Sequence, residues 1–79
     1  MNGLIFLALE DFLESRLGET AWEEVMKQAG LEGQLFEPDY FYPDQVAADL
    51  FEAAARRLKH PLPETLEQFG QHLAPGLVQ

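Results

Sequence analysis

The stretch that decides the fold is residues 1–17, which read MNGLIFLALEDFLESRL. At a helical spacing of about 100° per residue, its apolar side chains cover roughly 200° of one helix surface, about twice what one small core requires. They are Leu4, Ile5, Phe6, Ala8, Leu9, Phe12, Leu13 and Leu17. The polar arc is narrow and holds Glu10, Asp11, Glu14 and Ser15. The pattern predicts a helix that lies between two bodies, or one whose second body is missing from this chain.

The length, composition and charge of the chain limit the number of domains and the kinds of partner it can have. The 79 residues suit one domain, and 47% hydrophobic with 24% charged residues is a globular composition. Fourteen acidic against five basic side chains give a net charge of −9, which disfavours nucleic acid as a partner. The absence of cysteine fits a cytoplasmic protein, and the apolar run 4–9 is too short for a membrane span. We expect an acidic, soluble, cytoplasmic domain.

Caps and breakers divide the chain into four helices. Gly18 is well placed to close the first helix. Residues 20–23, Thr-Ala-Trp-Glu, have the pattern of a capping box that starts the second. Pro43 and Pro63 fit the first turns of the third and fourth, and Pro75 should end the last one. The expected helices span residues 1–17, 20–29, 44–59 and 63–73.

The segment between the second and third helices, residues 31–41, has no helical period. Its apolar side chains predict a lid across the core; they are Leu35, Phe36, Tyr40, Phe41 and the adjoining Tyr42. Trp22 and Phe51 should be buried. The predicted fold is all-α: one domain over residues 1–79, a small bundle of four main helices with an aromatic-rich loop.

No constellation of residues predicts catalysis, so we expect no enzyme. His60 and His72 lie on different elements, which excludes a helical pair of metal ligands, and each is more typical of an exposed histidine than of a single metal or haem ligand. Ser15 is the sole serine, so a serine–histidine–acid set is absent. The acids around the loop lack the spacing of a calcium-binding loop and are more typical of a solvated surface; they are Glu37, Asp39 and Asp44.

Several short motifs follow one another in a specific order. They are the opening Met1-Asn2-Gly3-Leu4-Ile5 with its apolar helix, Gly18-Glu19, Trp22, Ala29-Gly30-Leu31, the tyrosine- and aspartate-rich loop, Leu50 with the alanines after it, and the Glu64–Gly70 run. In this order they resemble the N-terminal half of an H-NOX domain, the haem nitric oxide/oxygen-binding family. The resemblance covers essentially all 79 residues.

The resemblance implies a part in haem-based sensing of nitric oxide and in signal transduction. Family members are longer, and their second part carries the proximal histidine and a Tyr-x-Ser-x-Arg motif, neither of which occurs here. Their first and fourth helices lie against the distal face of the haem. The matching cofactor-binding positions are Ile5, Leu9, Leu73, Ala74 and Leu77. Implied partners are haem, nitric oxide, and the missing C-terminal half or a downstream signalling protein; no metal ligand is implied within this chain.

The resemblance also bears on ligand choice. Oxygen-holding members place hydrogen-bond donors in the distal pocket. One is a tyrosine from the part absent here, supported by polar or indole side chains at positions matching Leu9 and Leu73, where leucine cannot donate a hydrogen bond. This implies a sensor of nitric oxide that discriminates against oxygen. The alternative is a haem-free interaction module, in which the wide apolar surface self-associates. If Ile5, Leu9, Leu73 and Leu77 are in water, the isolated chain should form a homo-oligomer.

Overall fold

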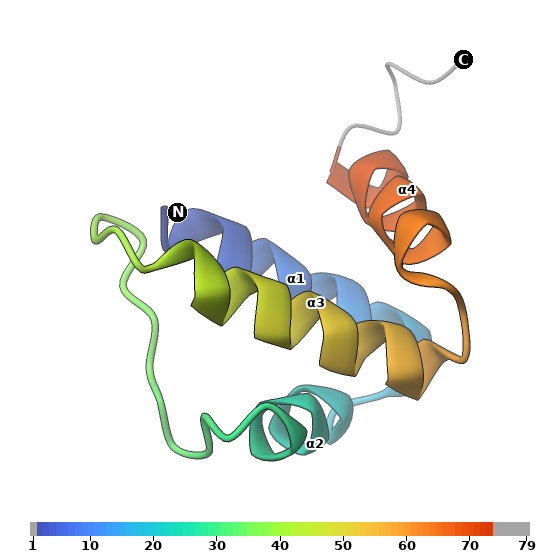
Figure 1. The fold of residues 1–79 in the computed structure, drawn as a ribbon, viewed down its shortest axis with the longest axis horizontal. Helices are drawn as coiled ribbons and strands as arrows, with labels where there is room; N and C mark the ends of the chain where they lie inside the picture. Colours follow the sequence, from blue (N-terminus) through green and yellow to red (C-terminus); the bar gives the residue numbers. More distant parts are fainter. Residues whose placement is uncertain (1, 74–79) are drawn as a thin grey trace.

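The computed structural model describes residues 2–73 as four helices (Figure 1). These are α1 (Leu4–Leu17), α2 (Ala21–Gln28), α3 (Asp44–Leu58) and α4 (Leu62–Leu73). Within residues 2–73 the sole extended pairing is an isolated antiparallel bridge between Asn2 and Phe41. The prediction of an all-α bundle with a loop between its second and third helices is confirmed. Among these residues, no helix is long and apolar enough to cross a membrane.

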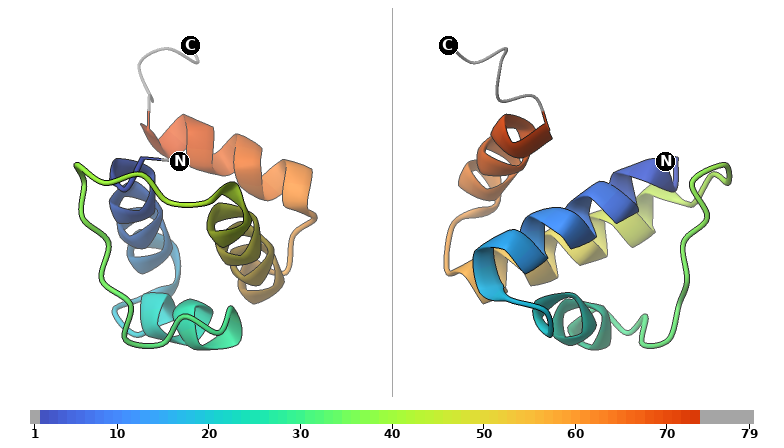
Figure 2. Two further views of the ribbon diagram at one scale, coloured as in Figure 1. Left: turned by 60° about the vertical axis from the view of Figure 1, so that its left-hand side comes forward. Right: turned by 180° about the vertical axis from the view of Figure 1, so that it is seen from behind.

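Helix α1 is one of two helices, with α3, that contact all the others in the bundle. It packs against α2, α3 and α4, and Figures 1 and 2 show it beside α3, with α2 on one side of the pair and α4 on the other. Four of its side chains are buried: Phe6, Leu9, Phe12 and Leu13. The wide apolar arc is therefore explained by neighbours within the chain. The expectation that Leu9 is in water is wrong, because the surrounding helices bury it completely.

Helix α3 has the apolar face that its sequence predicts. Leu50 and Phe51 are buried in the core, and Val46 and Leu58 pack against its edge. The three alanines at positions 53–55 are also buried, because their small side chains suit the contacts of α3 with α2 and α4. The helix ends one residue earlier than predicted, since Lys59 adopts a left-handed conformation with φ 62°.

The ends of α1, α2 and α4 follow the sequence signals only in part. Gly18 terminates α1 with φ 100°, a conformation that favours glycine. Thr20 instead takes a helical conformation and makes no side-chain capping hydrogen bond, so the predicted capping box is not formed. Helix α4 starts at Leu62, and the Thr65 hydroxyl, fully buried, donates to the Pro61 carbonyl at 3.1 Å.

Of the five loop side chains predicted to form a lid, only two cover the core. Phe36 stacks on Phe6 with ring centroids 4.3 Å apart, and Tyr42 meets the same ring edge-on. The others are exposed: Leu35 by 81%, Tyr40 by 64% and Phe41 by 79%. Backbone pairing explains the last two, because this part of the loop is held by the Asn2–Phe41 bridge and a Gly3 N–H bond to the Tyr40 carbonyl. The predicted lid is wrong for these three residues.

Candidate functional site

The sequence-predicted site centres on the place where α4 meets α1. There the fully buried Phe12 ring lies edge-on to Phe69 and His72, with centroid distances of 5.6 and 5.4 Å. The His72 Nε2 atom also lies 2.8 Å from an Asp11 carboxylate oxygen. Together these contacts bring the end of α4 to the flank of α1.

The predicted haem-facing residues occupy different environments around this contact. Ile5 is half-buried at the edge of the core, and Leu9 is fully buried inside it. Leu73 stands at the end of α4 and is 48% exposed. Ala74 and Leu77 lie outside the described residues. Ile5 and Leu73 are therefore partly exposed, whereas Leu9 could be reached only by repacking of the core.

Residues 2–73 include both hydrocarbon side chains and two imidazoles, His60 and His72. Hydrocarbon side chains such as those of Ile5 and Leu73 can cover a porphyrin face, but an axial ligand must be a histidine, thiolate, thioether or phenolate. Each imidazole has a carboxylate neighbour, since His60 Nδ1 lies 3.4 Å from Glu64 and His72 Nε2 lies 2.8 Å from Asp11. No group of three or more histidines and acids among these residues could hold a metal ion.

The three loop acids also remain a solvated surface. Glu37, Asp39 and Asp44 are all exposed. The Glu37 backbone N–H donates to the Tyr42 hydroxyl at 2.7 Å, which helps to fix the loop. Their exposure agrees with the solvated surface that the sequence predicts.

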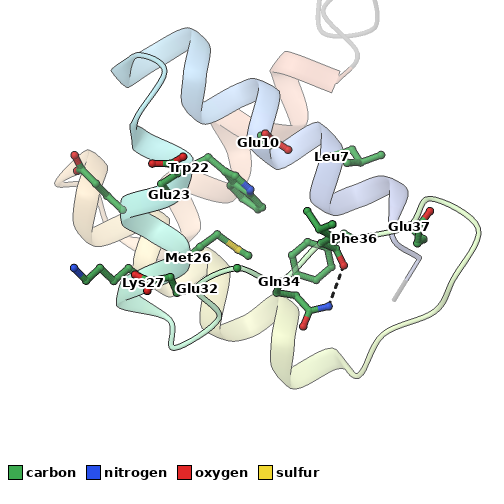
Figure 3. Close-up of a pocket in the computed structure, with 13 residues that line it drawn as sticks. Leu7, Glu10, Trp22, Glu23, Met26, Lys27, Glu32, Gln34, Phe36 and Glu37 are labelled. Carbon is green, nitrogen blue, oxygen red and sulfur yellow. Dashed lines mark hydrogen bonds between the residues drawn. The ribbon is translucent and has the colours of Figure 1, made fainter.

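A second feature, not predicted from the sequence, is a hollow on the α2 side of α1. It has a volume of about 750 Å³ and lies between α1, α2 and the loop residues 32–37 (Figure 3). Trp22 and Met26 extend from α2 toward Phe36 of the loop. Trp22, which we expected to be buried, is half-buried because one side of its ring lines this hollow. The apolar loop residues were a signal for it, but the sequence does not say which helices the loop crosses.

The Glu10 carboxyl at this hollow has a raised pKa. Burial, and next the negative charge of Glu14, raise the pKa of the Glu10 carboxyl above its ordinary value. Glu10 lies on the α1 side of the hollow, above Trp22 in Figure 3. A cation placed here would offset the cost of ionising this group.

Comparison with known proteins gives a family for the chain. No curated protein matches it. A family model described as haem-NO-binding matches residues 2–79, which is nearly the whole sequence. This chain is a member of the haem-NO-binding family, a family of haem-based gas-sensing domains.

Proposed function

We propose that this chain forms the distal wall of the haem pocket in a sensor of nitric oxide. The observation that carries the proposal is the family match over residues 2–79. The wall would consist of Ile5 and Leu9 on α1 and Leu73 at the end of α4, continued by Ala74 and Leu77. Because Leu9 is fully buried here, a porphyrin edge that reaches it would have to replace a packing contact of the core.

Ligand choice would follow from the hydrocarbon character of this wall. Ferrous haem supplies the binding site for a diatomic gas, and oxygen needs a hydrogen-bond donor there more than nitric oxide does. A charge-assisted hydrogen bond is worth about 1.5–3 kcal/mol, or about ten- to a hundredfold in affinity. Leu9 and Leu73 can donate none. We propose that the wall withholds this stabilisation from oxygen and leaves nitric oxide binding intact.

The chain would act by binding rather than by catalysis. We propose that it has no enzymatic activity of its own and works in the cytoplasm, where it passes the gas-bound state to a C-terminal half or a downstream signalling protein. The exposed end of α4, where Leu73 lies, gives such a partner a place to sense changes at the wall.

The test is reconstitution of the purified chain with ferrous haem, with free imidazole supplying the axial ligand. We expect a shifted Soret band, a nitric oxide adduct, and rapid oxidation rather than a stable oxygenated spectrum in air. Leu73→Asn adds an amide donor at a half-exposed position and should slow that oxidation. Leu66→Asn, also on α4 and 44% exposed, is the matched control and should not. A lasting oxygenated spectrum with the unchanged chain would contradict the proposal.

A further inference from the structure

The hollow between α1, α2 and the loop combines an apolar floor with an acidic rim, and we name it the acidic groove. Its floor consists of Leu7, Trp22, Met26 and Phe36. The groove is about 750 Å³ in volume, enough to take several side chains. Leu7 is 38% exposed, so part of the floor faces solvent. Aromatic and methionine side chains on a groove floor are typical of surfaces that receive the apolar face of a helix.

The charge of the rim is strongly unbalanced. Five carboxylates line the groove, and they belong to Glu10, Glu23, Glu24, Glu32 and Glu37. Glu24 is bonded to Arg57 at 2.6 Å, which leaves four acids facing one lining cation, Lys27. In Figure 3 the Lys27 side chain extends away from Phe36. The rim therefore favours a positively charged ligand. The net charge of −9 would also attract such a ligand to the chain as a whole.

We propose that the acidic groove binds a basic amphipathic helix of a partner protein. Leucine-like side chains of that helix would cover Trp22 and Phe36, and its lysine or arginine side chains would face Glu10, Glu23 and Glu32. The acidic side chains around the groove come from α1, α2 and the loop, so the charged residues that flank the apolar stripe of such a helix would find carboxylates beside them.

This assignment is independent of the haem proposal. The groove lies on the α2 side of α1, whereas Asp11 and Phe12 contact α4 on the other side. Both surfaces could be occupied at once. A failure to bind haem would not contradict the groove proposal, and a failure to bind the helical peptide would not contradict the haem proposal.

Trp22 reports directly on the groove, because it is the sole tryptophan of the chain and lies in the groove floor. The probe is a synthetic helical peptide with leucine on one face and lysine on the other, titrated against the full 79-residue chain. We expect a saturable change in Trp22 emission that weakens as salt is added. A peptide of the same composition in scrambled order keeps the charge but has no apolar face, and should bind about tenfold more weakly.

Paired variants separate the groove from the general acidity of the chain. Glu10→Gln with Glu23→Gln should weaken peptide binding about tenfold. Glu52→Gln with Glu67→Gln removes the same charge from exposed positions on α3 and α4 and should change binding less than about twofold. Circular dichroism checks that both double variants fold. Equal losses from the two pairs would mean nonspecific attraction and would overturn the proposal.

A floor variant tests the apolar part. Leu7→Gln should weaken peptide binding about threefold or more, because the leucine face of the peptide would then bury a polar amide. Leu66→Gln makes the same change at a comparably exposed site on α4 and should have no effect. If a small aromatic ammonium ion, phenyltrimethylammonium, saturates the Trp22 signal while the helical peptide does not, the groove takes small organic cations instead, and the proposal fails.

Discussion

Replacement of Phe12 by alanine tests whether the contact between α1 and α4 holds the bundle together. The ring is fully buried, and it lies edge-on to both Phe69 and His72. The Arg16 guanidinium carbon also lies 5.2 Å from the ring centroid. Loss of a buried phenylalanine ring costs about 3–5 kcal/mol, and part of that is the lost aromatic pairing.

This magnitude is large relative to the stability that a chain of this size can have. At about 0.05–0.15 kcal/mol per residue, 79 residues give an unfolding free energy of about 4–12 kcal/mol. Phe12→Ala should therefore remove a large share of the total or unfold the chain. Phe51→Ala should cost a similar amount, since that ring lies 5.3 Å from Phe69 on the α3 side. The double variant should cost less than the two separate losses added, because both rings share Phe69.

The assay is urea denaturation followed by circular dichroism, with Trp22 emission as a second probe near α2. Glu52→Gln is the control, and its exposed position predicts a change below about 0.5 kcal/mol. A loss of less than about 1.5 kcal/mol for Phe12→Ala would refute the reasoning, because it would mean that α4 contributes little to the core.

Three further outcomes can be checked with purified protein. The isolated chain should self-associate in sedimentation velocity through the exposed leucines of α4, and Leu66→Ser with Leu73→Ser should shift it toward monomer. Gly3→Ala should lower the free energy of unfolding by about 1–3 kcal/mol, because the added Cβ would collide with the Glu37 carbonyl. Gly70→Ala should raise the free energy of unfolding by about 0.5–1 kcal/mol, because Gly70 lies within α4 with open space around it. Glu10→Gln should raise the urea midpoint at pH 7 but not at pH 3. The pKa of Glu10 is higher in the folded chain than in the unfolded chain, so ionisation of Glu10 destabilises the fold at pH values above the unfolded-state pKa. Well below that pKa, Glu10 is protonated in both the folded and the unfolded chain, and the substitution has no charge to remove.

The helices themselves could be predicted because their signals are local. The face of α3 follows from one regular period, and Gly18 marks the end of α1 by the conformation it can adopt. Thr20 shows where a local signal fails. The residue types at positions 20–23 suit a capping box, but the backbone of Thr20 is already helical. A cap depends on the direction in which the chain enters the helix, and tertiary packing sets that direction.

The site was less predictable, because it depends on which helix covers which part of α1. The width of the apolar arc on α1 indicated two neighbouring bodies without saying that both belong to this chain. The arc alone predicts Leu9 to be available to a ligand, but Leu9 is buried, whereas Leu73 is exposed. The acidic groove has the same cause, since it forms only where Phe36 of the loop comes to lie beside Trp22 of α2.

The central position of α1 has a consequence for synthesis of the protein on the ribosome. This helix is made before α2, α3 and α4, yet all three are needed to bury its apolar surface. The packing of the nascent α1 therefore stays incomplete until α4 has been translated, because Phe12 finds Phe69 and His72 only there. During that interval the most apolar segment of the chain is open to chaperones and to aggregation with neighbouring nascent chains.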